Sequence, residues 1–493
     1  MKKWIVSNLF LLLAGVGIAQ KDPVKEVTRL ISGEETRVHL SFLAADEMRG
    51  RDTGSPEIDI AANYLAAHFG LLGLKKAPGM DTYFQPVPLE NIHPATGGEL
   101  SLGGDVFKFK EHFILFSGNN QEWKGEVVYV GYGSPEELRQ ANVRGKLVVA
   151  LAGKKDSDGN PMAVFFAAGD KFKDAKAAGA AGLVEIFASP QIPWPALVNY
   201  FANNVSMKVK SEDGGAPHLW LKDSDATGLK KLKESSGTSG TFKVEGIRTE
   251  SIPSKNVIGL LEGTDPKLKN EYLVVSAHYD HVGVTKRANQ TDSIYNGARD
   301  NAIGVVGLLS TAKYLTQFPP KRSVIFIALT AEEKGLLGSK YYADHPVVPL
   351  NQTVFNFNCD GAGYNDKTIA TVIGLERTTA EADLSKACEA FGLKAALDPV
   401  PEQNLFERSD NYNFAVKGVP AIDFAPGIKA FDEELNKYYH QPADEVSSLD
   451  FEYLTKYFRA YVYANVLLAN NAKAPTWKAG DKFEAEAKKL YGK

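Results

Sequence analysis

Five short, almost uninterrupted apolar runs follow one another in the C-terminal half of the chain and sharply narrow the possible folds. They are NVIGLLEG (256–263), EYLVVSAH (271–278), SVIFIALT (323–330), VFNFNCD (354–360) and PAIDFA (420–425). Between the second and third runs, residues 301–318 repeat apolar side chains at helical spacing. Strands that are apolar along their whole length, separated by helices, are typical of a sheet covered on both faces. The sequence therefore predicts an α/β fold, a mostly parallel mixed sheet flanked by helices on both faces.

Side chains that can bind metal ions stand where these apolar runs end. Because ligand sites of open α/β sheets form at the carboxyl ends of the strands, we expect these side chains at one edge of the sheet. Histidine mixed with carboxylates suits zinc, and the scarcity of cysteine favours a catalytic over a structural zinc site. The strand-end candidates are His278, Glu332, Glu333 and Asp360, joined by Asp300 before the helix 301–318 and by His440 in the loop YYHQPADE (438–445).

Each of these residues also has an ordinary structural explanation. A single histidine after a strand is more often a hydrogen-bonded surface residue. As a purely structural residue, Asp300 would cap the helix that follows, and Asp360 would shape a turn. The joint pattern favours the metal site, because several separate strands all end in metal-ligand residue types.

The tripeptide HYD adds a local reason for metal binding. In extended backbone, residues 278 and 280 point to the same side. We therefore expect the Asp280 carboxylate to hold the second imidazole nitrogen of His278, which would fix the tautomer and raise the basicity of the ligand.

With these residues in place, the chain resembles the di-zinc exopeptidase family, which includes secreted leucine aminopeptidases, glutamate carboxypeptidase and the catalytically inactive transferrin-receptor ectodomain. The resemblance also covers LAADEMRGRDTGSPE near the start and ERSDNYNF (407–414). The segments that carry it are SAHYDHVG (276–283), NGARDNAIG (296–304), TAEEKGLLGS (330–339), FNCDGAG (357–363) and YYHQPADE (438–445).

The resemblance implies two zinc ions per chain and assigns a role to each candidate. Asp300 would bridge the ions, and the peptide bond between Asp300 and Asn301 would be cis. Glu332 would not bind metal but would act as general base in the hydrolysis. His278 and Asp360 would complete one zinc site, and Glu333 and His440 the other. The family usually has an acidic residue where Arg299 stands, so a cation there would change the nearby electrostatics and substrate preference.

Residues 124–248 are predicted to form an inserted module that looks like a protease-associated domain, a β-rich α/β unit. Residues 20–123 and 249–493 would then form the zinc exopeptidase domain. The insert has no His, Asp or Glu cluster with ligand-like spacing, so we expect it to shape or support the site without chemistry of its own.

The N-terminus has the order of a secretory signal peptide, predicted over residues 1–19. Lys2 and Lys3 precede an apolar run to Ala19 that ends in small residues. This run is shorter than the ~20 residues that a membrane span needs, and no other stretch is long enough. We therefore expect a secreted or periplasmic mature protein that begins near Gln20 and has no membrane span.

Composition removes further classes of function. The 493 residues carry a formal net charge of −4 with no long basic block, so nucleic acid is not an expected partner. Two cysteines, Cys359 and Cys388, cannot form a disulfide scaffold, and a single bridge or two buried thiols are both compatible with the sequence. The oligomeric state is left open.

The sequence thus predicts an exported zinc aminopeptidase that removes N-terminal residues from peptide substrates. A carboxypeptidase is the nearest alternative, and Arg408 keeps it open as a contact for a substrate carboxylate. A glutaminyl cyclase uses a similar sheet but typically lacks such an insert. A metal-free binding protein would have lost several of the ligands that this chain retains.

Overall fold

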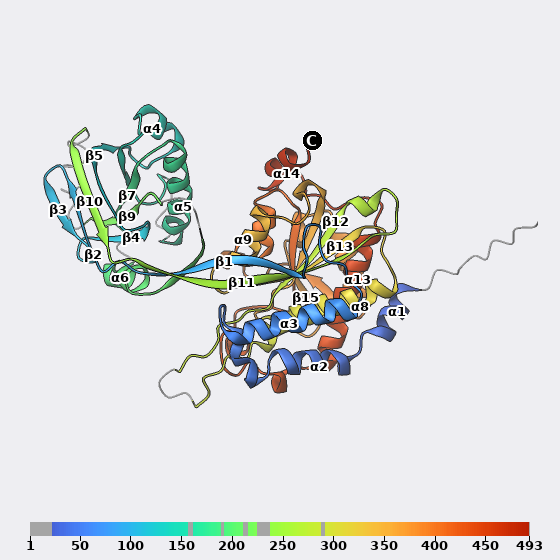
Figure 1. Ribbon diagram of the computed structural model, residues 1–493. Helices are drawn as coiled ribbons and strands as arrows, with labels where there is room; N and C mark the ends of the chain where they lie inside the picture. The colour runs from blue at the N-terminus through green and yellow to red at the C-terminus, as the bar shows by residue number, and fades with distance from the viewer. Residues whose placement is uncertain are drawn as a thin grey trace, which may run out of the picture. The chain divides into compact units, whose positions relative to one another are not determined.

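The computed structural model describes residues 22–155, 161–188, 192–210, 215–223, 237–286 and 291–492. The predicted signal peptide, residues 1–19, lies outside the described residues. The chain divides into two compact units, one formed by Met1–Gln85 with Lys255–Lys493 and the other by Pro86–Ser254. Each unit has its own sheet and helices (Figure 1).

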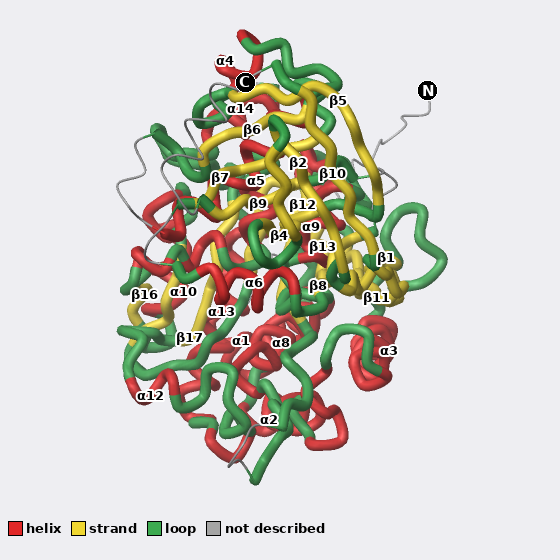
Figure 2. Tube along the Cα trace, turned by 90° about the vertical axis from the view of Figure 1, so that its left-hand side faces the viewer, coloured by secondary structure: helices red, strands yellow, loops and turns green. Residues whose placement is uncertain are grey.

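The sheet of the first unit is mixed and mostly parallel. β12, β13, β14 and β17 pair in parallel, and so do β15 and β16, whereas β11 on β13 and β15 on β17 are antiparallel. Figure 2 shows β12 and β13 side by side. The spatial order is β16 (Lys394–Ala396), β15 (Ile369–Ile373), β17 (Ala421–Pro426), β14 (Thr353–Asn358), β12 (Tyr272–His278), β13 (Ser323–Leu329) and β11 (Arg248–Leu261).

Both faces of this sheet are buried, which explains why its strands are apolar throughout. Leu273 and Phe326 belong to a core that also holds residues of α3 (Pro56–Leu71), α8 (Ile303–Gln317), α10 (Glu381–Glu389) and α13 (Phe451–Asn470). Their strand neighbours Val274 and Ile325 point to the opposite core, with residues of α9 (Leu337–Asp344) and α11 (Asn411–Ala415). The predicted fold class is therefore confirmed.

Local sequence signals begin the helices of this unit. Ser55 accepts a hydrogen bond from the Ile58 N–H and Pro56 occupies the first turn, which starts α3. At the start of α13, Asp450 accepts hydrogen bonds from the N–H groups of Glu452 and Tyr453. α1 (Pro23–Leu30) and α2 (Gly33–Leu43) precede α3, and α12 (Glu433–Asn436) and α14 (Glu484–Tyr491) lie near the C-terminus.

The second unit is built on an eight-stranded mixed sheet. Strands β5, β6, β7 and β9 pair in parallel, and the strands at both ends of the order pair antiparallel. α4 (Pro135–Gln140), α5 (Pro161–Ala177) and α6 (Trp194–Ala202) belong to this unit, as does the antiparallel pair of β1 (Phe84–His93) and β8 (Ser206–Val209). The order is β3 (Asp105–Lys108), β2 (Gly97–Leu102), β10 (Ser239–Glu245), β5 (Gln121–Tyr129), β6 (Leu147–Leu151), β7 (Gly182–Phe187), β9 (His218–Lys222) and β4 (Phe113–Ser117).

The boundaries of the second unit differ from the predicted 124–248. The unit starts at Pro86 and ends at Ser254, because β2 pairs along its whole length with β10. Residues 86–123, predicted to belong to the exopeptidase domain, therefore fold with the insert. Hydrogen bonds between strands more than a hundred residues apart leave no local signal in the sequence, which explains the difference.

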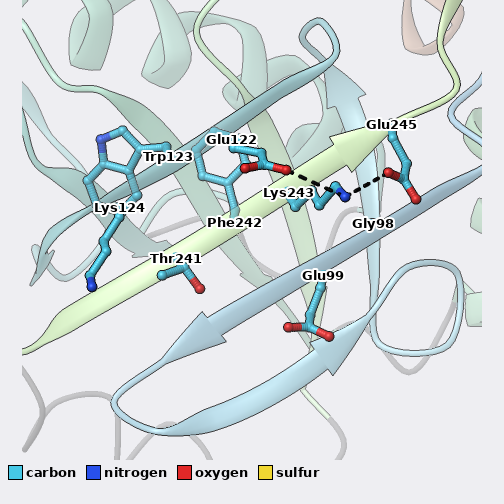
Figure 3. Close-up of a pocket in the computed structure, with 9 residues that line it drawn as sticks. All are labelled: Gly98, Glu99, Glu122, Trp123, Lys124, Thr241, Phe242, Lys243 and Glu245. Carbon is cyan, nitrogen blue, oxygen red and sulfur yellow. Dashed lines mark ion pairs between the residues drawn. The ribbon is translucent and has the colours of Figure 1, made fainter.

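A hollow of about 690 Å³ lies on the second unit over β2, β5 and β10 (Figure 3). Glu99, Trp123 and Thr241 are among the residues that line it. Lys243 forms ion pairs there with Glu122 (3.4 Å) and Glu245 (2.9 Å). Lys243 is thus paired with two carboxylates of its own unit.

Two further expectations can be compared with the structure. Cys359 and Cys388 are both buried and free, so the two-thiol alternative holds. Among the described residues, no helix combines the length and the apolar character needed to cross a membrane.

Candidate metal centre

The strand ends bring the predicted ligands together at one edge of the first sheet. His278 is the last residue of β12, Glu332 and Glu333 follow β13, and Asp360 follows β14. These three strands are neighbours and parallel, so their carboxyl ends share an edge. Potential ligand atoms lie within 4.8 Å of one another in two groups, His278, Glu332 and Asp360 in one and His281, Asp300, Glu333 and His440 in the other.

Asp300, a member of the second group, also faces the first group. Its Oδ1 is 3.3 Å from Nε2 of His278, and its Oδ2 is 3.1 Å from Nε2 of His440. The Asp300–Asn301 peptide bond is cis, as the resemblance implied. Each carboxylate oxygen of Asp300 thus faces a different histidine, which is the orientation that a bridging ligand requires.

The imidazole of His278 is oriented by main chain rather than by the Asp280 carboxylate. Its Nδ1 is 3.1 Å from the carbonyl oxygen of Asp280, whereas the Asp280 Oδ1 lies 3.8 Å away. A carbonyl can only accept, so Nδ1 donates and Nε2 is left to face Asp300 and Asp360, the latter at 3.2 Å. The Asp280 carboxylate therefore lies at ion-pair distance from the ring, while the hydrogen bond of Nδ1 goes to the carbonyl of the same residue.

The Asp280 carboxylate instead holds the two adjacent glutamates. Its oxygens accept hydrogen bonds from the backbone N–H of Glu332 at 3.1 Å and of Glu333 at 3.3 Å. They also accept one from the Thr53 hydroxyl at 3.0 Å. The side chain is fully buried, so these donors compensate for the loss of water around its charge.

The adjacent glutamates enter different halves of the centre. Oε2 of Glu332 lies 4.0 Å from Nε2 of His278, and Oε2 of Glu333 lies 3.3 Å from Nε2 of His440. Ala331 just before them has a positive φ of 56°, so the chain turns sharply as it leaves β13. Two neighbouring side chains can therefore serve two positions without competing for one.

His281 belongs to the centre although the sequence pattern assigned it no role. Its Nδ1 is 2.8 Å from Oε1 of Glu333, and its Nε2 is buried without a hydrogen-bond partner among the described residues. Gly297, with a φ of +63°, makes room for the ring, because a Cβ there would lie 2.6 Å from the imidazole. The motif SAHYDHVG contains a second histidine three residues after His278, which was the available signal.

The electrostatics of the centre favour a bound cation. Burial alone would lower the pKa of His278, but Asp360 and Glu332 outweigh it and raise that pKa well above its ordinary value. Burial would also lower the pKa of His440, yet Asp300 and Glu333 raise it to about 10. Without another cation, the carboxylates thus hold protons on the imidazoles.

The carboxylates divide into two kinds. Burial and Asp300 would raise the pKa of Glu333, but its contacts with His281 and His440 lower it to about 2. Burial raises the pKa of Glu332 well above its ordinary value, against the effect of His278 and with that of Asp360. Glu333 is therefore held as an anion, whereas Glu332 is held where it can carry a proton.

The residues present fit a pair of zinc ions. The two groups offer histidine nitrogens and carboxylate oxygens, the ligand types that catalytic zinc uses. Nε2 of His278 lies between two carboxylates, an arrangement that needs positive charge among these atoms. No cysteine belongs to either group of described residues.

Arg299 is paired with an acidic side chain of its own. Its Nη1 lies 3.1 Å from Asp444 and donates to the Ser448 hydroxyl at 2.6 Å, and its guanidinium carbon lies 3.7 Å from the centre of the Tyr438 ring. Asp444 also accepts hydrogen bonds from the backbone N–H of Arg299 and of Asp300. Asp444 thus largely compensates the charge of Arg299, which was predicted to alter the electrostatics near the site.

Comparison with known proteins agrees with this geometry. The model of peptidase family M28 matches residues 256–464. Aminopeptidase YwaD of Bacillus subtilis is 28% identical over 291 residues, which make up 58% of this chain and 56% of that protein. The probable leucine aminopeptidase 2 of Aspergillus oryzae is 24% identical over 492 residues, with 93% of this chain and 88% of that protein covered.

Among solved structures, the aminopeptidase from Aneurinibacillus sp. strain AM-1 shares the fold, with a TM-score of 0.52 and 22% identity over 92% of this chain and 97% of that one. The family match spans all five predicted metal ligands and Glu332. Over residues 256–464, the chain is thus similar to peptidase family M28.

Proposed function

We propose that the protein is a zinc-dependent aminopeptidase that binds two zinc ions and hydrolyses N-terminal residues from peptides. The observation that carries the proposal is the position of Asp300, whose two oxygens lie 3.3 Å and 3.1 Å from histidines of two different ligand groups. The relatives named above as aminopeptidases support the choice of reaction.

The ligand assignment follows the two groups. Asp300 would contact both ions, with His278 and Asp360 on one side and Glu333 and His440 on the other. His281 would orient Glu333 through the 2.8 Å contact with Oε1, which leaves Oε2 toward His440. Bound zinc supplies Lewis-acid activation of a water molecule and of the scissile carbonyl.

The residues of the chain then move the proton. Glu332 accepts a proton at its carboxylate from the attacking water, for which it lies on the His278 side of the centre. It next delivers the proton to the nitrogen of the departing amine. Asp280 keeps Glu332 in place through the backbone N–H, and the amide bond is cleaved without a covalent intermediate on the enzyme.

A substrate screen tests the proposal. The purified protein is assayed against dipeptides with a free or blocked N-terminus and with a free or blocked C-terminus, with and without a zinc chelator. We expect chelator-sensitive hydrolysis that requires the free N-terminus and tolerates a blocked C-terminus. Hydrolysis that requires the free C-terminus would favour the carboxypeptidase alternative, and an absence of both zinc and hydrolysis would contradict the proposal.

Export and the nature of the insert are further parts of the proposal. The charged, apolar and small-residue order of residues 1–19 supports a signal peptide, and the β-rich α/β architecture of the second unit supports a protease-associated domain. Fractionation of cells that express the full chain, followed by N-terminal sequencing, tests the first. A mature N-terminus near Gln20 outside the cytoplasm is expected, and an uncleaved cytoplasmic protein would contradict it.

A further inference from the structure

Arg51 is an almost fully buried arginine that bonds to main chain instead of to a carboxylate. Its side chain is 1% exposed, and among the described residues its guanidinium hydrogen bonds all go to main-chain carbonyls. Burial lowers the pKa of Arg51 to about 10, although the carboxylates of Asp280 and Asp300 act to raise it. The guanidinium donates to four carbonyls, those of Leu43 (2.5 Å), Tyr279 (2.9 Å), Asn296 (2.7 Å) and Gly297 (3.0 Å).

Three of these carbonyls belong to the loops that carry the metal ligands. Tyr279 is the residue directly after His278, and Gly297 precedes Asp300 by three positions. The planar guanidinium has its N–H groups in a fixed arrangement, so contacts on several of its edges set the distance between the two loops. Arg51 therefore links the loop of one ligand to the loop of another.

The segment around Arg51 is shaped to lie against the same loops. Gly50 has a φ of +68°, and a Cβ there would lie 2.5 Å from the Tyr295 carbonyl and 2.6 Å from the Gly283 carbonyl. The His281 N–H donates to the Arg51 carbonyl at 3.3 Å, and the Gly283 N–H donates to the Gly50 carbonyl at 3.1 Å. The close approach of two backbones requires glycine at position 50.

Thr53, two residues after Arg51, contacts the carboxylate that holds Glu332 and Glu333. Its hydroxyl donates to Oδ2 of Asp280, the same oxygen that accepts from the Glu333 N–H. Residues 49–54 lie outside the segment matched by the family model, which begins at residue 256. A short segment near the N-terminus thus contacts the two ligand loops and the carboxylate that holds the two glutamates.

We propose that Arg51 and Thr53 are positioning residues for the metal centre, which hold the ligand loops at the spacing that zinc binding requires. The inference rests on the proposed function only in naming zinc as the ion. Neither side chain touches the ligand atoms themselves, so both act through the loops. Their loss should therefore weaken zinc binding more than it weakens the fold.

The test uses the full chain in two matched pairs. Thr53→Val removes the hydroxyl at nearly constant shape, and Thr53→Ser retains it. Arg51→Met removes the guanidinium, and Arg49→Met is its control, because Arg49 is 56% exposed and lies 3.6 Å from Glu57 in a surface contact. Zinc affinity is measured by competition with a chromophoric chelator, and thermal unfolding is recorded for the apo and zinc-loaded forms.

We expect about 10–100-fold weaker zinc binding in Thr53→Val and Arg51→Met, as is typical when residues that support metal ligands are lost. Thr53→Ser and Arg49→Met should bind zinc like the original chain. If Thr53→Val binds zinc as tightly as Thr53→Ser, the inference is overturned, even if Arg51→Met fails to fold. A purely structural role would instead lower the apo melting temperature and leave the zinc affinity of the folded protein unchanged.

The same titration separates this inference from the proposed function. If the original chain binds no zinc, both are overturned. If it binds zinc and hydrolyses peptides while all four variants match its affinity, only the positioning role is overturned.

Discussion

Each unit of the protein buries a cluster of ionisable side chains, and the two clusters differ in their balance of charge. In the second unit a single carboxylate, Glu185, is surrounded by donors. His218 lies 2.7 Å from it, Lys171 forms an ion pair with it, and the Trp220 N–H donates at 3.3 Å. Lys171 also donates to the Leu151 carbonyl at 2.5 Å. The charge of Glu185 is therefore compensated by side chains of its own unit.

The cluster of the first unit lacks that balance. Asp300, Glu332, Glu333 and Asp360 converge on three histidines, one of which keeps a buried nitrogen without a partner among the described residues. A buried excess of carboxylates is costly unless positive charge compensates it. Residue types alone therefore do not identify a metal site, whereas an uncompensated set of buried ligand atoms does.

The same substitution, glutamate to glutamine, should act differently in the two clusters, and the largest expected effect is on turnover at the metal centre. Glu332→Gln should lower kcat by about 10²–10⁴-fold, because the amide cannot take up the proton of the attacking water. Zinc content, measured by atomic absorption, should stay at the level of the original chain. Near-normal turnover in a zinc-loaded Glu332→Gln protein would refute the general-base role.

Glu185→Gln is the counterpart in the second unit and should affect stability instead. Removal of one charge from a buried ion pair leaves Lys171 uncompensated, which typically costs about 3–5 kcal/mol. Chemical denaturation of the full chain should show an earlier transition for this unit, with zinc binding retained. An unchanged denaturation curve would mean that the cluster contributes nothing to the stability of the unit.

Zinc removal should act on the first unit alone. Ligand binding to the folded state adds about 4 kcal/mol when the free ligand is a thousandfold above Kd, and chelation removes that contribution. Hydrogen exchange with and without chelator should show loss of protection around β12–β14 and none in β5–β7. Equal loss in both units would contradict the assignment of the zinc site to the first.

Asp280→Ala should weaken zinc binding by about 10–100-fold. The cause would be the loss of the acceptor for the Glu332 and Glu333 N–H groups, since the His278 ring is held by a main-chain carbonyl. Asp280→Asn, which keeps one acceptor oxygen, should lie between Asp280→Ala and the original chain in a zinc titration. An affinity for Asp280→Ala equal to that of the original chain would exclude this role.

The smallest expected effect is a pH dependence of the second unit. Burial alone would raise the pKa of Glu185, but His218 and Lys171 lower it below its ordinary value of 4.5. A carboxylate with a lowered pKa stabilises the fold above its unfolded-state pKa and loses that contribution as the pH falls through the folded-state value. Acid titration of the unit should therefore show a decrease in stability below about pH 4.5 that is smaller in Glu185→Gln.

Much of the metal centre was predictable because several of its residues directly follow strands that are recognisable as apolar runs. The apolar runs located β12, β13 and β14, and the pattern alone therefore made the polar residues at their ends candidates. The contact of Asp280 was not predictable, because alternation along a strand shows the side to which a residue points but not which of its atoms turns toward the ring. His281 was passed over for a similar reason, since its neighbour Glu333 lies 52 positions away in the chain.

Periodicity and residue type in the chain alone were sufficient for the α/β class and for the candidate metal ligands, whereas the distinct roles expected of Glu332 and Glu333 came from the family resemblance. Only the folded molecule decided where the insert begins, how Arg299 is compensated by Asp444, and that Arg51 holds loops more than two hundred residues away. The physical reason is the range of the interactions. Periodicity is written in neighbouring residues, whereas strand pairing, buried charge and hydrogen bonds to main chain depend on segments that meet only when the chain has folded.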